Sequence, residues 1–233
     1  MNGVSFVVRA GSITGLIGPN GAGKSTVLTM IGGSLKPTAG SIRFGRKEIA
    51  GRPAHEVARL GIMRTFQISS EFPRLTVLEN LLVAVPHQHG ESLGNAVFRR
   101  RSWRRQERAS LERARTLLER FGIAEKEDEY AGELSGGQKR LLELSRALMA
   151  EPTILLLDEP MAGVNPTLAQ RIEEHLLELR DEGLTMLMVE HELSVVERVC
   201  DPVVVMAQGR VIFEGSMAEV RSNEEVLDAY LVG

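Results

Sequence analysis

The stretch of sequence that decides the fold is Gly18-Pro19-Asn20-Gly21-Ala22-Gly23-Lys24-Ser25-Thr26. It satisfies in full the pattern GxxxxGK followed by Ser or Thr. It lies between residues 12–17, whose apolar run predicts a strand, and residues 25–31, whose apolar spacing predicts a helix. Glycines here let backbone N–H groups face a polyphosphate, and the helix N-terminus adds a positive dipole. The stretch therefore predicts a polyphosphate site, in which Lys24 reaches the β- and γ-phosphates and Ser25 coordinates Mg²⁺.

Two carboxylates follow a second decisive segment, the apolar run of residues 154–157, which predicts a buried parallel strand. In an open α/β sheet the carboxyl ends of such strands face the ligand crevice. Asp158, the first carboxylate after the run, is predicted to hold Mg²⁺ or its water. Glu159, the next residue, is predicted to polarise the attacking water as a general base. A positioned base contributes about 10²–10⁴-fold to a rate.

Around these motifs the chain alternates strand and helix patterns. Short strands are predicted at residues 4–8, 41–44, 48–49 and 63–67, with a helical turn at residues 53–60. After residue 150 a helix at 167–181, a strand at 184–189 and a helix at 193–200 precede a hairpin over 203–213 and a short C-terminal helix. These patterns predict an α/β core with a β-rich layer.

Helical patterns fill the segment between about residues 75 and 148. Thr76 and Glu79 form a predicted capping box, as do Ser135 and Gln138, and each box precedes an apolar helical pattern. We therefore expect one 233-residue domain, in which residues 1–74 and 149–233 form the nucleotide-binding core with its β layer. Residues 75–148 form the predicted helical subdomain.

The composition limits the class of protein. The 28 Lys and Arg residues against 31 Asp and Glu residues give a net charge of −3, which argues against a globally basic nucleic-acid binder. Aromatic residues make up 4% of the chain, too few for a base-stacking platform. The single cysteine, Cys200, cannot form an internal disulfide, which is typical of a reducing compartment. The apolar runs have the length of strands, so the chain is expected to be soluble and to reach a membrane only through a partner.

The most discriminating segment is Leu134-Ser135-Gly136-Gly137-Gln138. Two glycines behind a helix-capping serine expose several unpaired N–H groups at a helix start, which forms an anion site. A second phosphate-binding helix start, far along the chain from the first, suggests that two chains share one nucleotide. Taken alone, the same five residues also fit an ordinary helix cap.

Together these motifs resemble those of the ATP-binding-cassette (ABC) ATPases. The glycine loop, Gln67, the segment beginning at Leu134, the pair Asp158-Glu159, and His191 occur in the family's order and span nearly the whole chain. The resemblance implies an α/β fold with a P-loop NTPase core, an antiparallel β subdomain and an inserted α-helical subdomain. It also implies ATP as the nucleotide and a head-to-tail dimer, in which the Ser135–Gly137 segment of one copy closes over the γ-phosphate that Lys24 of the other copy holds.

The resemblance implies further roles for single residues. His191 would contact the γ-phosphate, and Gln67 would sense Mg²⁺ and the attacking water. The loop of Gln67 would lead into the helical subdomain that touches the membrane partner. The family normally has an aspartate where this chain has Asn165. The aromatic residue that stacks on adenine normally lies on a strand upstream of the position of Met1, so none is assigned here.

Several segments also resemble those of one subfamily of ABC ATPases. The segments Arg64-Thr65-Phe66-Gln67, Ala162-Gly163-Val164-Asn165-Pro166 and Val189-Glu190-His191 are similar to those of branched-chain amino acid importer ATPases. The likeness implies a peripheral protein at the cytoplasmic face of the inner membrane. Its implied partners are a second ATPase subunit, identical or a paralogue, a permease pair and, indirectly, a solute-binding protein, with no nucleic acid.

Two alternatives stay open from the sequence. One is a soluble ABC-type ATPase acting on nucleic acid or ribosomes, although the tandem cassettes or long coiled-coil insertions usual in that class do not occur in this sequence. The other is a small-molecule kinase with the same glycine loop, which has no use for the Leu134–Gln138 segment. The basic cluster at residues 99–105 could contact lipid phosphates or RNA, and such a junction is more often solvated surface.

Overall fold

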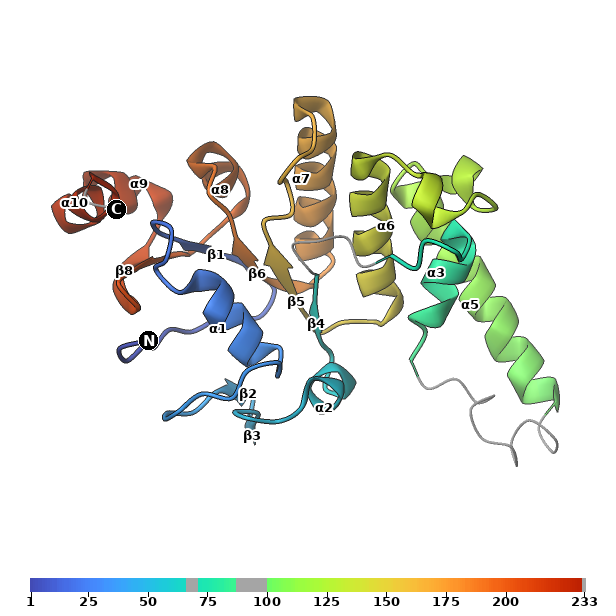
Figure 1. Ribbon diagram of the computed structural model, residues 1–233, viewed down its shortest axis with the longest axis horizontal. Helices are drawn as coiled ribbons and strands as arrows, with labels where there is room; N and C mark the ends of the chain where they lie inside the picture. Colours follow the sequence, from blue (N-terminus) through green and yellow to red (C-terminus); the bar gives the residue numbers. More distant parts are fainter. Residues whose placement is uncertain (66–70, 87–99, 232–233) are drawn as a thin grey trace. The chain divides into compact units, whose positions relative to one another are not determined.

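A six-stranded sheet has the order β4-β5-β6-β1-β7-β8, and its strands β1, β5 and β6 lead into the glycine loop, Glu159 and His191 (Figure 1). The computed structural model describes residues 1–65, 71–86 and 100–231, the segment 100–104 by its backbone only. The strands are β1 (Ile13–Ile17), β2 (Arg43–Phe44), β3 (Lys47–Glu48), β4 (Ile62–Arg64), β5 (Ile154–Asp158), β6 (Thr185–Val189), β7 (Val203–Ala207) and β8 (Arg210–Gly215).

The first five strands in that order run parallel, and β8 pairs antiparallel with β7. In the register, Asp158 of β5 lies opposite Val189 of β6, and Val189 lies opposite Leu16 of β1. Arg64 of β4 lies opposite Leu156 of β5. Because parallel strands end at the same edge, the carboxyl ends of β4, β5, β6 and β1 lie together there.

The described residues also form helices in both parts of the chain. They are α1 (Lys24–Ile31), α2 (Ala54–Arg59), α3 (Val77–Val83), α5 (Arg100–Arg120), α6 (Gly136–Met149), α7 (Pro166–Asp181), α8 (Leu193–Val199), α9 (Met217–Ser222) and α10 (Glu224–Leu231), with short 3-10 turns η2 (Ala124–Lys126) and η3 (Ala131–Glu133). Both predicted capping boxes are confirmed, Thr76 with Glu79 before α3 and Ser135 with Gln138 before α6. The C-terminal segment forms two helices where the sequence predicted one.

The strand predicted at residues 4–8 is wrong. Val4, Phe6 and Val8 do alternate with exposed neighbours and pack against the core, as the period of two requires. Within the described residues, however, this segment has no hydrogen-bonded strand beside it; before it, Asn2 N donates to Gly209 O at 2.8 Å. The alternation of apolar and exposed residues here comes from an extended, half-buried segment that is not part of a sheet.

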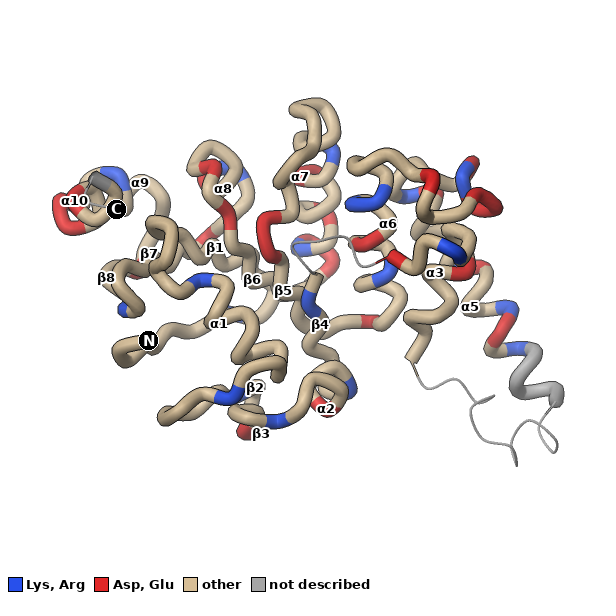
Figure 2. The backbone as a smooth tube through the Cα atoms, viewed as in Figure 1, with Lys and Arg blue, Asp and Glu red and all other residues tan. Residues whose placement is uncertain are grey.

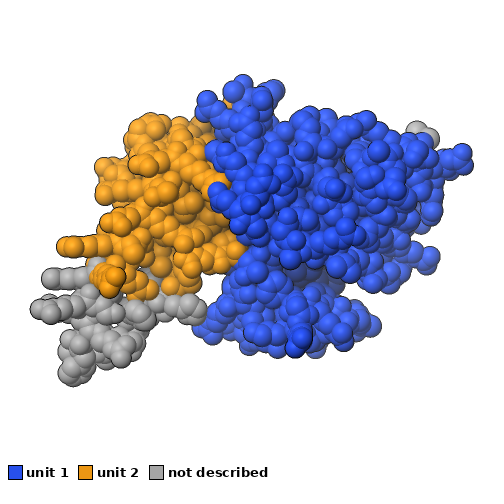
Figure 3. Space-filling model, turned by 180° about the vertical axis from the view of Figure 1, so that it is seen from behind, with its two compact units in different colours: residues 1–67, 153–162, 166–233 blue, residues 68–152, 163–165 orange. Residues whose placement is uncertain are grey.

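The chain divides into two compact units (Figure 3). The first contains residues 1–67, 153–162 and 166–233, and its apolar core packs the sheet against helices such as α1, with Leu16, Leu28 and Leu156 fully buried. The second contains residues 68–152 and 163–165, in which α3, α5 and α6 pack on one another. Among the described residues, no helix combines the length and the apolar character that a membrane crossing requires.

Candidate functional site

The glycine loop follows β1 and takes a backbone path that excludes most side chains. Gly18, Gly21 and Gly23 have φ values of +142°, +78° and +102°. A Cβ on Gly18 would lie 1.9 Å from the backbone oxygen of Met206 on β7. The first glycine is therefore required by close backbone packing, and the other two by the turn that presents the loop's N–H groups.

Lys24 is the first residue of α1 and lies folded into this loop. Its side chain is buried, and Nζ donates to Gly18 O at 2.7 Å and to Pro19 O at 3.0 Å. Burial lowers the pKa of Lys24, while the nearby carboxylates of Glu159 and Asp158 act in the opposite direction. A buried ammonium held by two carbonyl oxygens can exchange these acceptors for phosphate oxygens, which supply the same chemistry with more negative charge.

Asp158, at the end of β5, lies beside the start of α1. Ser25 Oγ approaches Asp158 Oδ1 at 3.4 Å, and Arg64 Nη2 donates to Asp158 Oδ2 at 2.8 Å. A hydroxyl and a carboxylate oxygen are hard donors that suit Mg²⁺, which takes one or two protein ligands and completes its shell with water and phosphate. No group of three or more His, Cys, Asp or Glu side chains that could hold a metal occurs among the described residues.

Glu159 and His191 form a close pair at the ends of neighbouring strands. His191 Nε2 lies 2.6 Å from Glu159 Oε1, so a protonated ring nitrogen donates to the carboxylate. Glu159 adopts φ +50°, a left-handed conformation that costs a non-glycine residue of order 1–3 kcal/mol. Its backbone N–H donates to Val189 O at 2.9 Å, which fixes the turn against β6. The surrounding structure thus holds the Glu159 carboxylate in a strained and defined position.

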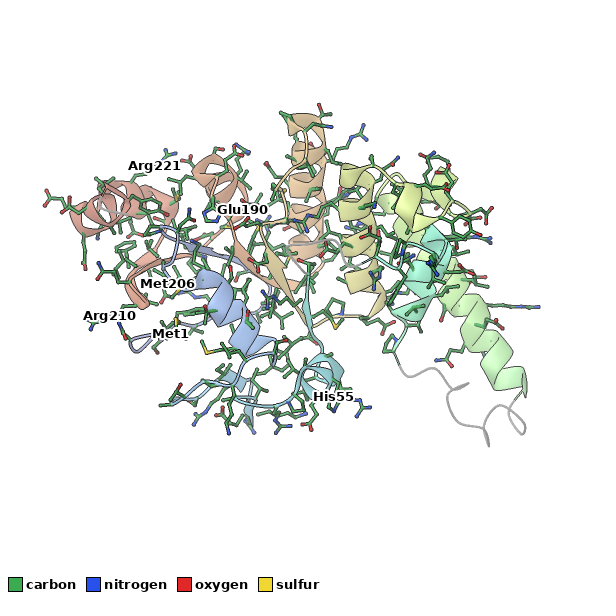
Figure 4. The ribbon with its side chains drawn as sticks, in the orientation of Figure 1. Met1, His55, Glu190, Met206, Arg210 and Arg221 are labelled. Atoms are coloured by element: carbon green, nitrogen blue, oxygen red, sulfur yellow. The ribbon has the colours of Figure 1, made fainter. Side chains whose placement is uncertain are left out.

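Glu190 is a functional candidate that sequence reasoning missed (Figure 4). It is 5% exposed, and its Oε1 and Oε2 accept hydrogen bonds at 3.1 Å from the backbone N–H of Met161 and of His191. Burial raises the pKa of Glu190, and the hydrogen bonds from the backbone N–H groups of Met161, His191 and Glu192 oppose that rise. One buried carboxylate therefore joins the loop after Glu159 to the loop that bears His191. A charged residue directly after a buried strand was the available signal.

Arg64 was missed as well, because it entered the sequence argument only as part of a likeness. Its guanidinium donates to Asp158 and, through Nη1 at 2.9 Å, to Thr29 Oγ1. The charged residues at this edge thus include the cations Lys24 and Arg64 as well as the predicted acids. Figure 2 marks the positions of Lys and Arg in blue and of Asp and Glu in red along the backbone.

The remaining predicted site residues lie elsewhere. Ser135 and Gly136 are exposed at the start of α6, in the second compact unit. The capping box engages the N–H groups of Ser135 and Gln138, while those of Gly136 and Gly137 belong to the first helical turn, which supplies no acceptor of its own. Gln67, and the side chains of the basic cluster from residue 99 to residue 104, lie outside the described residues.

Comparison with known proteins gives a consistent likeness over the chain's length. A family model described as ABC transporter matches residues 1–162, and one described as branched-chain amino acid ATP-binding cassette transporter matches residues 210–231. A probable branched-chain amino acid transport ATP-binding protein LivG from Archaeoglobus fulgidus is 42% identical, over 99% of this chain and 89% of that protein. The high-affinity BraF protein of Pseudomonas aeruginosa, described in the same transport terms, is 39% identical over 99% and 91%.

Solved structures of similar fold are also ATP-binding cassettes of ABC transporters. The ADP conformation of an ATP-binding cassette of an ABC transporter is 39% identical and superposes with a TM-score of 0.82, covering 99% of this chain and 91% of that one. A nucleotide-free ATP-binding cassette from an ABC transporter is also 39% identical, with a TM-score of 0.81 over 97% and 90%.

Proposed function

The chain belongs to the ABC transporter family and is an ATP-binding, ATP-hydrolysing protein, and from that premise we propose that it powers a branched-chain amino acid importer. The observation that carries the proposal is the convergence at one sheet edge of Lys24, the Ser25–Asp158 pair and the Glu159–His191 pair. Relatives described as branched-chain amino acid transport ATP-binding proteins supply the substrate class. None of the relatives named here is described as acting on nucleic acid, so that alternative gains no support.

In the proposed mechanism, the glycine loop and Lys24 bind the triphosphate. Glu159 accepts a proton from a water as the oxygen of that water attacks the γ-phosphorus in line. The bond between the γ-phosphorus and the bridging oxygen to the β-phosphate breaks, and ADP and phosphate result. A hydrogen bond from His191 Nε2 orients the Glu159 carboxylate. The hydrogen bond from the Glu159 backbone N–H to Val189 O keeps that carboxylate at the end of the strand. The protein's contribution is therefore positioning and electrostatic stabilisation.

Ser25 and Asp158 would hold Mg²⁺, with Gln67 as a third predicted ligand. When bound there, Mg²⁺ neutralises charge that develops on the β- and γ-phosphate oxygens. Thr26 and the loop residues from Gly18 to Gly23 complete the predicted phosphate-binding set.

A second copy, identical or a paralogue, completes the proposed active site. The exposed Ser135–Gly136 start of α6 and the following residues Gly137 and Gln138 would close over the γ-phosphate held by the other copy. We place the protein at the cytoplasmic face of the inner membrane, attached through a permease pair that works with a solute-binding protein.

The test is nucleotide-dependent dimer formation. Glu159→Gln should slow hydrolysis and trap a dimer with ATP and Mg²⁺, measured by light scattering after size-exclusion chromatography. Gly136→Asp in the same background should stay monomeric, because its carboxylate would face a partner's phosphates. The substitution should leave the fold intact, since a Cβ at Gly136 meets nothing within 4 Å and an acid suits the first turn of a helix. A Glu159→Gln protein that stays monomeric with ATP would contradict the shared site.

The transport assignment has its own test. The wild-type protein, purified from membranes in mild detergent, should bring down integral membrane permease subunits, and cells expressing Glu159→Gln should lose uptake of radiolabelled leucine. Recovery of RNA or ribosomal proteins in place of permeases would favour the nucleic-acid alternative.

A further inference from the structure

We propose that Arg64 is a positioning residue that neutralises Asp158 until nucleotide arrives, and thereby makes divalent-cation binding depend on ATP. The proposal rests on the proposed function, because it takes Ser25 and Asp158 as the metal ligands. It concerns Arg64 on β4, a residue to which the sequence assigned no role in metal binding.

The contacts place Arg64 directly on the metal-binding carboxylate. Nη2 donates to Asp158 Oδ2 at 2.8 Å, and Nη1 donates to Thr29 Oγ1 at 2.9 Å. Thr29 in turn donates its hydroxyl hydrogen to Ser25 O at 2.6 Å, so the guanidinium is held against the first turns of α1. Asp158 keeps Oδ1 toward Ser25 Oγ. The arginine thus leaves the serine side of the carboxylate for a metal and fixes its orientation.

Both charged groups of the Arg64–Asp158 pair are largely shielded from water, which strengthens their electrostatic interaction. The side chain of Asp158 is 1% exposed and that of Arg64 is 16% exposed. A carboxylate so deeply buried requires a compensating charge, and a close arginine supplies it. The guanidinium Nε is also buried, and it has no acceptor within the described residues. Because Arg64 leaves this buried donor without an acceptor, hydrogen bonding alone does not account for the residue at this place. Its positive charge beside Asp158 is therefore the more important property.

The local charge balance leads to the nucleotide dependence. Lys24 and Arg64 are cations at this edge; the carboxylates of Asp158 and Glu159 both act on Lys24, and Asp158 also pairs with Arg64. Glu190, whose charged form burial disfavours, lies close to Glu159. A divalent cation that enters this site meets repulsion from both cations. The phosphates of ATP add negative charge beside Lys24 and tip the balance toward the metal. Arg64 therefore disfavours metal binding to the nucleotide-free protein.

A purely structural ion pair would behave differently. Removing it would lower the stability of the protein and would leave metal affinity without nucleotide unchanged or weaker. On our proposal the loss of the positive charge at Arg64 raises that affinity. The sign of the change separates the two roles.

The experiment uses Mn²⁺ as the probe, with free Mn²⁺ measured by electron paramagnetic resonance in titrations of the full chain without nucleotide. Arg64→Gln should bind Mn²⁺ at least about tenfold more tightly than wild type, because a nearby unit charge acts on a divalent ion in a poorly screened site. Arg43→Gln is the matched control, since Arg43 is an exposed arginine paired with Glu48 away from the site. It should match wild type.

Three further variants make the test decisive. Arg64→Lys keeps the charge and should stay within a few-fold of wild type. Asp158→Asn should abolish the gain in the Arg64→Gln background. If circular dichroism shows that Arg64→Gln does not fold, Thr29→Val, which removes the acceptor of Nη1, should give a few-fold gain.

Equal affinity of wild type and folded Arg64→Gln would overturn the proposal, as would an equal gain in Arg64→Lys or a gain that survives Asp158→Asn. Should Thr29→Val be the variant used, the absence of any gain would overturn it too. With ATP present, wild type should bind Mn²⁺ tightly. Failure of that measurement would count against the proposed metal site itself, so the two failures are distinguishable.

Discussion

Replacing Gly18 by alanine should destabilise the protein far more than the same change elsewhere in the glycine loop. The added Cβ would lie 1.9 Å from Met206 O, and real Cβ atoms essentially never approach within 3.0 Å. The backbone of β1 or of β7 would have to move by roughly 1 Å in a close-packed sheet. The φ of +142° also disfavours any L side chain. We expect a loss of at least about 4 kcal/mol in the free energy of unfolding.

Gly21→Ala is the matched comparison. Gly21 also has a positive φ, +78°, yet a Cβ there meets nothing within 4 Å. Only the conformational cost applies, about 1–2 kcal/mol. For a chain of this size each kcal/mol shifts Tm by about 2–4 °C. Thermal unfolding followed by circular dichroism should therefore show a fall of roughly 8–16 °C for Gly18→Ala and about 2–8 °C for Gly21→Ala.

The comparison separates packing from conformational strain. If both variants lost the same stability, the contact between Gly18 and β7 would not be the reason for the first glycine. Gly18 O also accepts a hydrogen bond from Lys24 Nζ. The fraction of Gly18→Ala protein that still folds should therefore bind ATP more weakly than wild type.

Three further predictions concern single side chains. Glu159→Gln should retain ATP binding and lose about 10²–10⁴-fold in phosphate release, and a wild-type rate would remove Glu159 from the mechanism. Burial raises the pKa of Glu190, so its titration removes stability as pH rises from the ordinary value of 4.5 through the folded-state pKa. Glu190→Gln should therefore make urea-unfolding free energies less dependent on pH above 4.5, and an unchanged slope would count against a buried charge. Burial also raises the pKa of the Cys200 thiol, so native protein at pH 8 should react with a disulfide reagent at least about tenfold more slowly than urea-unfolded protein. Equal rates would show that Cys200 is accessible.

Local patterns in the sequence predicted the elements well. The capping boxes at Thr76 and Ser135 are confirmed because each joins residues three apart, a spacing visible in the sequence. The strand that ends in Asp158 is confirmed because a run of apolar residues bounded by polar ones is itself the signal. Pro166 begins α7, as a proline at a first helical position should.

Contacts between distant residues escaped the same reasoning. Arg64 and Asp158 are 94 residues apart, and Glu190 and Met161 are 29 apart, so no spacing rule relates them. Sheet order decides these contacts, and the sequence alone does not specify which strands become neighbours. The segment at residues 4–8 shows the converse, since an alternating pattern becomes a strand only beside another strand, and none of the described residues forms one there.

The sheet order also explains how the site's parts depend on one another. Across the carboxyl edge, Arg64 joins β4 to β5 through Asp158, and Glu159 joins β5 to β6 through His191. Ser25 joins β5 to the helix that follows β1, again through Asp158. Asp158 therefore takes part in both the contact with Arg64 and the contact with Ser25. A cation bound between Ser25 and Asp158 would thus weaken the attraction between Asp158 and Arg64 of β4.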